Sequence, residues 1–436
     1  MWVGVDDTDG PDGGCTTFVL ASIIAQADRL GVDLLGYPKL VRLDPNVPWK
    51  TRGNGALAAR FGHGRGVART IGELEGRRIR CFPEGRGLSG AEQDRLFAAA
   101  CSVVEVGASR AARTDPALVA APRRPGSELY RRAVAELVPV RTARTALRAA
   151  RGRAWFRGSP RGLVGATAAI AWPGRRRTFE LIAYRSADRI GTRRDVDPGS
   201  VRAAAQRHPE LFLCHDPRTR RLLVAPHTGC PILYGIRSTH AEILPDVLGE
   251  IRSEPVSQWL IFETNQGTGD HLVERRGPRW PRYAAGTVLG TVRTSPEVIP
   301  GGHVRFLLEA TAGATFECWT FEPTKTLAAV ARGLRPGDRV RLDAGRGRSP
   351  ELRVEGITVL HLVERRGRPR PPRCPRCQRS AESRGTGRGF RCPGCRTRFP
   401  PESSRAPSEP PAFPRGRYDP TPSARRHLHP RVPEPG

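Results

Sequence analysis

The sequence predicts a multidomain protein that combines α/β and α+β domains with a β-barrel and a small cysteine-rich module. The chain has 436 residues, more than one hydrophobic core usually organises. Helix and strand patterns alternate over residues 1–275, whereas short strands follow one another after residue 282. Four cysteines stand in two closely spaced pairs near the end of the sequence. We therefore expect several separate cores followed by a module that a metal holds together.

The first element is a short apolar strand that ends in three carboxylates. Val3 and Val5 precede Asp6, Asp7 and Asp9, and glycines follow them. Strand ends in α/β sheets open onto ligand crevices, and clustered carboxylates there suit hydrated Mg²⁺ held against nucleotide phosphates. Considered alone, an ordinary acidic turn that caps the next segment explains the same residues equally well.

The elements that follow predict a phosphate site. Residues 16–30 have the apolar spacing of an amphipathic helix, whose positive N-terminal end would face the acidic loop. A strand over 34–43 leads to a basic, glycine-rich loop, in which glycines allow close backbone approach to an anion. The spacing is not that of a Walker A loop, and a basic turn is the alternative. The candidate contacts are Lys50, Thr51, Arg52, Gly53, Asn54 and Gly55.

Helix and strand patterns continue to alternate through the first two expected domains. A strand over 56–61 and a helix over 91–106 complete the first one. In the second we expect a helix over 130–138 and strands over 163–172 and 178–184. Strands and helices at this spacing fit a ferredoxin-like α+β domain.

The pattern then changes to five short strands with a helix over 326–332 between the third and the fourth. This order suggests an OB-fold, which often binds single-stranded nucleic acid, and another small β-barrel is the alternative. The expected strands cover 287–292, 304–309, 315–321, 339–342 and 352–360.

The cysteine pairs predict a zinc ribbon. Cys374 and Cys377 form one C-x-x-C knuckle, and Cys392 and Cys395 form the other. Four thiolates at this spacing can hold one Zn²⁺ in tetrahedral geometry, whereas a redox site needs a single pair. Several arginines surround the knuckles, so we expect the ribbon to grip a phosphate backbone as well.

Composition points to a polyanionic partner. The chain has 72 Lys and Arg against 43 Asp and Glu, a formal net charge of +29, which favours a nucleic-acid-binding protein. The scattered remaining cysteines are typical of a reducing compartment, and the sequence has no signal peptide or membrane segment. We therefore expect a cytoplasmic protein.

Several of these strings resemble the archaeal tRNA-Ile 2-agmatinylcytidine synthetases. The resemblance starts with Asp6–Asp9, Cys15–Thr17 and Lys50–Ala56 and extends to about residue 396. The strings downstream are Phe179–Arg185, Gly235–Arg237, Phe262–Thr268, Gly301–Val304, Glu322–Lys325 and the ribbon cysteines.

The resemblance implies a fold and a reaction. It implies a kinase-like catalytic domain, and the expected divisions are 1–125 (kinase-like, ATP-binding), 126–275 (ferredoxin-like), 280–362 (OB-fold), 370–399 (zinc ribbon) and 400–436 (disordered tail). Enzymes of this family use ATP with Mg²⁺ to activate C2 of the wobble cytidine in the CAU-anticodon isoleucine tRNA, and they attach agmatine there. Loss of oxygen from an amide-like carbonyl requires such activation, and phosphorylation supplies a good leaving group.

The resemblance also assigns residues. By the family motif Asp6, Asp7 and Asp9 are the metal-binding and catalytic acids, and Thr16 is itself phosphorylated; the Lys50 loop contacts the ATP phosphates. Agmatine carries a guanidinium that needs a carboxylate, for which Glu180, Asp195 and Asp197 are candidates, with structural salt bridges as the alternative.

A function of another class also fits part of the sequence. The OB-fold and the ribbon alone would suit a non-catalytic protein that binds single strands. The acidic loop favours the ligase, because three carboxylates repel phosphate unless a metal intervenes.

Overall fold

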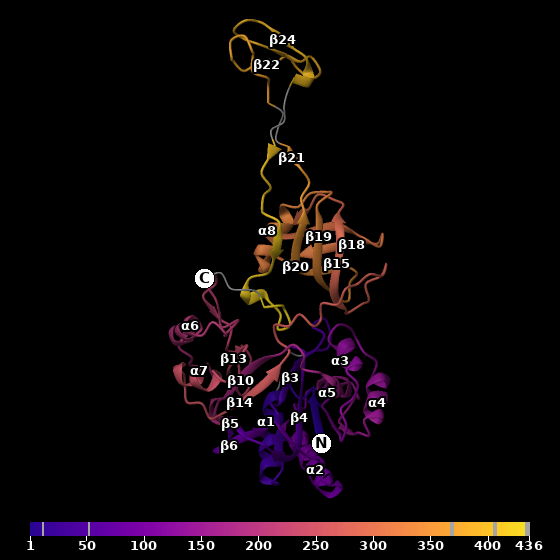
Figure 1. The fold of residues 1–436 in the computed structure, drawn as a ribbon, viewed down its shortest axis with the longest axis vertical. Helices are drawn as coiled ribbons and strands as arrows, with labels where there is room; N and C mark the ends of the chain where they lie inside the picture. Colours follow the sequence, from indigo (N-terminus) through magenta and orange to yellow (C-terminus); the bar gives the residue numbers. More distant parts are fainter. Residues whose placement is uncertain (11–12, 51–52, 367–369, 404–407, 432–436) are drawn as a thin grey trace.

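The computed structural model describes residues 1–10, 13–50, 53–366, 370–403 and 408–431. They form an elongated molecule in which a β-barrel stands on a large α/β body and a small ribbon projects from the far end of the barrel (Figure 1). None of the helices in this described part is long and apolar enough to span a bilayer.

The acidic loop follows β1 (Trp2–Asp6), an interior strand of the twelve-stranded sheet of the body. β1 pairs antiparallel with β4 (Gly55–Arg65) and with β8 (Ala117–Ala121). α1 (Thr16–Arg29) covers this part of the sheet, and the predicted helix over 16–30 is confirmed. The other elements before residue 157 are β2 (Asp33–Leu35), β3 (Lys39–Arg42), β5 (Arg69–Leu74), β6 (Arg77–Phe82), β7 (Glu84–Arg86), α2 (Gly90–Gly107), α3 (Glu128–Ala133), α4 (Val140–Ala149) and β9 (Arg153–Phe156).

The following segment completes the same sheet. β14 (Gln258–Thr264) pairs in parallel with β3 and antiparallel with β5 and β10 (Thr178–Tyr184), so two segments far apart in sequence share one surface. One hydrophobic core continues across this junction. The remaining elements are α5 (Gly162–Ala171), α6 (Pro198–Arg207), β11 (His215–Asp216), β12 (Arg221–Leu222), β13 (Ile232–Ser238) and α7 (Leu244–Glu250).

The strand predicted over 163–172 is wrong, because these residues form α5. Nearly every residue of α5 is buried, so the helix shows no polar face and its pattern matches that of a buried strand. Its alanines favour a helix, and they let it approach β1 closely. A Cβ on Gly4 would lie 2.2 Å from the Ala166 carbonyl oxygen, so β1 requires glycine there.

Two other predicted elements are shorter than expected. The strand over 34–43 is divided into β2 and β3 by a turn at Gly36, whose φ of 72° favours glycine. The helix over 130–138 ends as α3 at Ala133, and Pro139 disfavours helical backbone in the residue before it. The helix over 91–106 is confirmed as α2, with a Ser89 capping box.

The five strands and the helix predicted for the barrel are all present. β15 pairs with both β17 and β19, which closes the sheet, while α8 packs against its core. The elements are β15 (Ala285–Val292), β16 (Glu297–Ile299), β17 (His303–Ala310), β18 (Thr315–Thr320), α8 (Thr326–Arg332), β19 (Arg339–Arg346) and β20 (Leu352–His361).

The ribbon is inserted into a two-stranded stalk. β21 (Arg365–Arg366) leads outward and β25 (Ser408–Glu409) pairs antiparallel with it on the return (Figure 1). The ribbon itself contains β22 (Glu382–Ser383), β23 (Phe390–Arg391) and β24 (Arg398–Phe399).

The prediction of a disordered tail over 400–436 is wrong for the described residues 408–431. β26 (Gly416–Tyr418) pairs with β20 of the barrel, and the chain then reaches the body, where Leu428 is 1% exposed. The tail has too few apolar residues to form a core of its own. It is ordered because it fills a surface that the barrel and the body already provide.

Candidate active site

The acidic loop begins at Asp6, the half-buried last residue of β1. Asp7 has a positive φ of 55°, which aspartate tolerates better than most residues. Its carboxylate accepts a hydrogen bond from the Asp115 amide at 3.1 Å, and the Thr8 carbonyl accepts one from the Ser109 amide at 2.9 Å. The segment that precedes β8 therefore fixes the loop from one side.

Burial makes these acids unusual. It raises the pKa of Asp6 well above the ordinary value, and the neighbouring Asp7 raises it further. Burial also raises the pKa of Asp7 to about 6. Such carboxylates gain from a nearby cation. Among the described residues, however, only the ribbon cysteines place three or more ligand atoms within 4.8 Å of one another, so Asp6, Asp7 and Asp9 are not a preformed three-carboxylate metal site.

Thr16 lies directly beside this loop. It is the first residue of α1, and its hydroxyl donates to Asp9 Oδ1 at 3.4 Å. Among the described residues no side chain caps the N-terminus of α1, so the helix presents its positive end beside Asp9. Asp9 and Thr16, to which the resemblance gives separate roles, are thus in contact.

A cavity of about 470 Å³ opens between α1, β3, β10 and β13. It brings together residues from the first segment, the second segment and the C-terminal tail. Of the predicted site residues it is lined by Asp9, Thr16, Gly53, Gly55 and Glu180. Sequence reasoning missed other polar residues of its wall, which include Arg42, Arg237 and His427.

Glu180 is the buried acid of this cavity and is 3% exposed. Arg237 Nε lies 3.2 Å from its Oε1, Arg42 Nη2 lies 4.0 Å from its Oε2, and Gln266 Nε2 donates a hydrogen bond to Oε2. A Cβ on Gly235 would lie 2.5 Å from Glu180 Oε1, so that glycine makes room for the carboxylate.

Two guanidinium groups face the single Glu180 carboxylate, so the positive charge at this point of the cavity exceeds the negative charge and can bind another anion. Within the described part of the chain, Arg42 Nε is buried without a hydrogen-bond acceptor, whereas Arg237 Nε lies within ion-pair distance of Glu180 Oε1 but forms no hydrogen bond to it. Burial lowers the pKa of Arg42, which is the expected effect of holding a guanidinium away from water. Buried donors of this kind suit a phosphate.

A second cavity of about 270 Å³ lies on the other side of the loops. Asp6 and Asn54 line it, together with apolar residues and Trp49, over whose ring Arg161 stacks at 5.3 Å. A Cβ on Gly165 would lie 1.9 Å from Asp6 Oδ2, so α5 makes room for that acid. The acidic loop and the Gly53–Gly55 segment therefore border both cavities.

The remaining predicted residues lie elsewhere or are held by other contacts. Lys50 Nζ donates to the Pro45 carbonyl, and burial lowers the pKa of Lys50. Thr51 and Arg52 lie outside the described residues.

Asp195 and Asp197 do not line either cavity as the structure describes them. Asp197 caps α6 by accepting from the Gly199 amide at 2.8 Å and also pairs with Arg252. The Asp195 amide donates to Glu254 Oε2 at 3.0 Å, and the Asp195 carbonyl accepts from the Glu254 amide at 2.9 Å. The salt bridge stated as the alternative is present for Asp197.

The sequence gives only weak indications of the three cavity residues that were missed. Arg42 is the last residue of β3 and Arg237 is the last but one of β13, and a charged residue near a strand end marks either an exposed edge or a lined cavity. His427 belongs to a tail whose composition predicts disorder, so no local pattern pointed to it.

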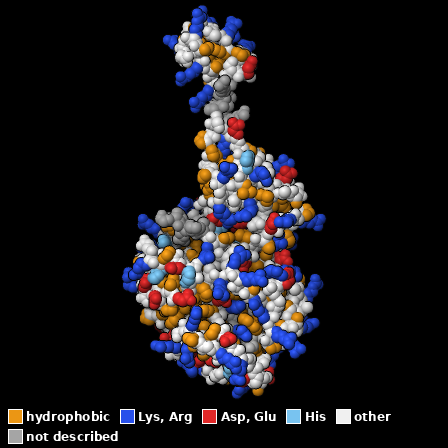
Figure 2. All heavy atoms as spheres, viewed as in Figure 1, with side chains coloured by type: hydrophobic (Ala, Val, Ile, Leu, Met, Phe, Trp, Pro, Cys, Tyr) orange, Lys and Arg blue, Asp and Glu red, His pale blue; other side chains and the backbone are white. Residues whose placement is uncertain are grey.

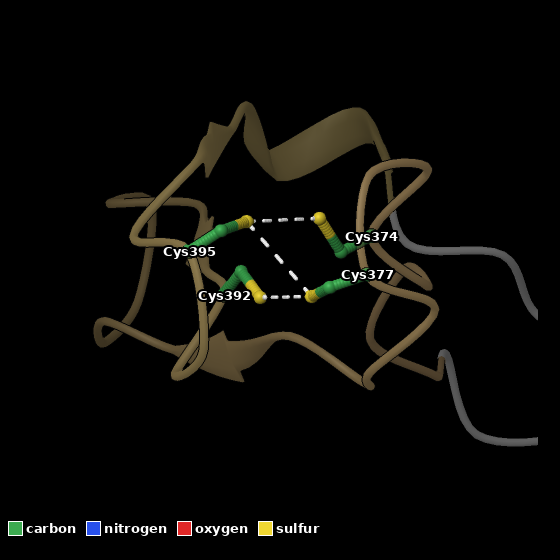
Figure 3. Close-up of side chains that lie close together, drawn as sticks. All are labelled: Cys374, Cys377, Cys392 and Cys395. Carbon is green, nitrogen blue, oxygen red and sulfur yellow. Dashed lines mark hydrogen bonds between the residues drawn. The ribbon is translucent and has the colours of Figure 1, made fainter.

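The four ribbon cysteines meet as the spacing predicts. Figure 3 shows the two knuckles facing each other, with Cys374 Sγ 3.3 Å from Cys395 Sγ and Cys377 Sγ 3.2 Å from Cys392 Sγ. Tetrahedral Zn–S bonds of about 2.3 Å place sulfurs about 3.8 Å apart, so this donor set fits structural Zn²⁺.

The ribbon and the barrel offer separate features to a polyanion. Lys and Arg side chains are frequent over the ribbon face in Figure 2, and its exposed arginines include Arg376, Arg379, Arg384, Arg388 and Arg391. On the barrel, the half-buried rings of Trp319 and Phe321 lie 6.1 Å apart and nearly parallel. Half-buried aromatic rings can stack on bases.

Comparisons with known proteins identify the family of this chain. Family models match residues 2–154 (TiaS TCKD domain), 160–271 (TiaS FLD domain) and 371–406 (TiaS C-terminal zinc ribbon domain). The tRNA 2-agmatinylcytidine synthetase TiaS of Methanopyrus kandleri is 35% identical to this chain and covers 98% of it, with 95% of the relative matched. The chain belongs to the TiaS family.

Other TiaS proteins match over the same length. The TiaS of Methanosarcina mazei is 33% identical over 98% of this chain and 96% of its own. The crystal structure of apo TiaS superposes with a TM-score of 0.83 at 30% identity, covering 98% of this chain and 95% of that one. The crystal structure of TiaS in complex with its isoleucine tRNA, AMPCPP and agmatine gives 0.80 at 28% identity over 98% and 96%.

Proposed function

We propose that this chain is an ATP-dependent tRNA-modifying ligase that attaches agmatine to C2 of the wobble cytidine in the CAU-anticodon isoleucine tRNA. The observation that carries the proposal is the large cavity, in which Asp9 and Thr16, two half-buried arginines and Glu180 face one space. Solved TiaS structures described with an isoleucine tRNA, an ATP analogue and agmatine support the choice of substrates.

The reaction takes two steps. Phosphoryl transfer from ATP converts the C2 oxygen into a phosphate ester. The agmatine amine then attacks C2, so that a C–N bond forms, the C–O bond breaks, phosphate leaves and the amine loses a proton. Charge neutralisation and positioning dominate the first step, and the arginines and helix terminus of the cavity supply both.

We assign the acidic loop to metal-assisted phosphoryl transfer. Asp6, Asp7 and Asp9 would hold Mg²⁺, which enters as the MgATP substrate and offsets the burial of these carboxylates. The resemblance implies that Thr16 is phosphorylated; ATP would supply that phosphoryl group in a transfer separate from the two steps above. Asp9, to which the Thr16 hydroxyl donates a hydrogen bond, would accept the proton that the hydroxyl loses.

The phosphate contacts combine two sets of residues. The Lys50 loop supplies Lys50, Thr51, Arg52, Gly53, Asn54 and Gly55, as the resemblance implies. Arg42 adds a buried Nε donor that has capacity for an acceptor, and Arg237 adds a guanidinium that is paired with Glu180 beside it. The apolar second cavity, with the Trp49 ring at its mouth, suits a planar base.

Glu180 is the carboxylate that we favour for the agmatine guanidinium. It lines the cavity, whereas Asp195 and Asp197 do not, and the Asp197 carboxylate is also held by the α6 cap and by Arg252. A guanidinium would share Glu180 with Arg237, and a phosphate nearby would balance the added positive charge.

The domain names are part of the proposal. We assign a kinase-like first domain, a ferredoxin-like second domain, an OB-fold barrel over 280–362 and a zinc ribbon over 370–399. The matched segments, 2–154 and 160–271, favour a first boundary near residues 154–160 in place of 125.

The test is an assay with ATP, agmatine and the tRNA transcript, followed by nucleoside mass analysis. Wild-type protein should add agmatine to the wobble cytidine, and a transcript with uridine at that position should stay unmodified. Thr16→Ala should abolish the product, whereas Ser22→Ala on the same helix should not. If wild-type protein leaves the transcript unmodified, the proposed function is wrong.

A further inference from the structure

The chain returns from the ribbon to the active site. We call residues 408–431 the return segment. It pairs with the barrel through β26, and its backbone then bonds to the body (Figure 1). The carbonyls of His427 and Leu428 accept from the Gly267 and Gly269 amides, each at 2.9 Å. The end of the segment is thus docked directly after β14.

Arg426 anchors the segment between the barrel and the body. Its Nη1 lies 3.0 Å from Glu355 Oε1 and donates to Asn46 Oδ1 at 2.9 Å. Asn46 in turn donates to the Asp44 carboxylate, and the Asp44 carbonyl accepts from Asn54 Nδ2 at 2.9 Å. The anchor therefore connects to the loop that borders both cavities.

His427 forms part of the large cavity's wall and connects to its acid. Its Nδ1 lies 2.9 Å from Gln266 Oε1, and Gln266 Nε2 donates to Glu180 Oε2. Arg42, burial and Arg237 hold the pKa of His427 well below its usual range, so the ring is neutral. Nδ1–H then donates to Gln266, which directs the NH₂ end of that amide at Glu180.

The imidazole also packs against the phosphate loop. A Cβ on Gly53 would lie 2.9 Å from His427 Cδ2, so the ring occupies the space that a side chain at position 53 would need. One residue of the tail thus contacts both the predicted phosphate loop and, through Gln266, the predicted guanidinium acceptor.

We propose that the return segment is a wall of the reaction cavity and that His427 is a positioning residue, which fixes the Glu180 carboxylate through Gln266. The assignment of agmatine to Glu180 rests on the proposed function, whereas the docking of the segment does not. Without the donor at position 427, the Gln266 amide can turn its oxygen toward Glu180, and the two acceptors would repel each other.

Three variants test the proposal against a matched control. His427→Ala removes the ring, His427→Phe keeps its bulk without the donor, and His427→Asn restores a donor near the Nδ1 position. The exposed His240 changed to alanine is the control. Thermal unfolding checks that each variant folds, and agmatine KM and kcat are measured at saturating tRNA and ATP.

We expect His427→Ala and His427→Phe to raise the agmatine KM by about tenfold, with a smaller change in kcat, because a buried acceptor is left unpaired. His427→Asn should return KM to within about threefold of wild type. The positioning role would be overturned by an unchanged agmatine KM in a folded His427→Phe variant. It would also be overturned if His427→Asn had an agmatine KM as high as that of His427→Phe. These two variants decide the question if His427→Ala does not fold.

A second measurement separates this proposal from the proposed function. Hydrogen exchange at the Gly267 and Gly269 amides reports docking of the segment without any substrate. Slow exchange is expected even if the protein proves inactive with agmatine. Fast exchange at both amides would overturn the docking, even in an enzyme that modifies its tRNA.

Discussion

The zinc ribbon and the reaction cavity are assembled in opposite ways. The ribbon takes its four sulfurs from one short stretch, and the metal they suit replaces a hydrophobic core. The cavity takes its walls from residues as far apart as Asp9 and His427, which only the folded body and barrel bring together. A site of the first kind can be removed as a unit, whereas a site of the second kind is sensitive to changes far from the reacting atoms. The predictions below test that contrast.

The largest effect should come from Asp7→Asn. Asparagine tolerates the positive φ of 55°, so the loop should keep its shape while losing a charge next to the proposed site of phosphoryl transfer. We expect single-turnover product formation to fall about a thousandfold, on the order of 4 kcal/mol, with tRNA affinity nearly unchanged. Asp188→Asn, at an exposed acid, is the control. Full activity of Asp7→Asn would refute the assigned mechanism.

Two deletions compare the regions directly. Replacing residues 367–407 by a short linker removes the ribbon, and the pairing of β21 with β25 keeps the two ends adjacent. We expect tRNA affinity to fall about a hundredfold, while MgATP binding persists. The salt dependence of tRNA binding should also become shallower, by about one log–log unit for each phosphate that the ribbon no longer neutralises.

The reciprocal deletion removes the chain after residue 407. It keeps the ribbon and takes away the return segment, so agmatine binding should be lost although the ribbon still binds tRNA. Calorimetry with agmatine and a tRNA filter assay distinguish the two outcomes. If both deletions impair tRNA binding alone, the return segment has no part in the cavity.

A smaller effect should follow from Cys374→Ser. Purified wild-type protein should carry about one zinc per chain. The variant should lose most of that zinc and about tenfold in tRNA affinity, without a change in MgATP binding. Metal analysis and a binding titration test this, with Cys101→Ser on α2 as the control. If zinc-free protein binds tRNA normally, the ribbon does not contribute to tRNA affinity.

The smallest effect concerns the anchor of the return segment. Burial alone would raise the pKa of Glu355, but Arg426 and His271 hold it at about 2 against an ordinary 4.5. A lowered carboxyl pKa contributes stability that is complete above the unfolded value and is lost as the pH falls through the folded one. By pH 4 about 1 kcal/mol should be lost. Thermal unfolding between pH 7 and 4 should therefore be less pH-dependent in Glu355→Gln, and equal slopes would refute the ion pair.

The same contrast explains what the sequence could predict. The ribbon ligands follow from spacing alone, and α1, α2 and the barrel elements follow from periodicity and glycine position, because each pattern is local. Asp9 and Thr16 were identified by the resemblance, and they are in contact. Arg42 and Arg237 were missed because their position in a cavity depends on strand pairing across the junction of β3, β10, β13 and β14. The helix α5 was mistaken for a strand because burial on all sides removed its periodicity.

The position of the ribbon within the stalk determines the order in which the ribosome synthesises the ribbon and the last wall of the cavity. A ribosome makes β21, then the ribbon, then β25 and only afterwards the residues that reach the cavity. A nascent chain can therefore form the body sheet and the barrel before the cavity wall at His427 exists. Every chain whose cavity is complete has already made its ribbon, so a product of premature termination within the ribbon would lack the wall as well. The order of the elements in the gene thus keeps a molecule without a finished ribbon from acquiring a complete active site.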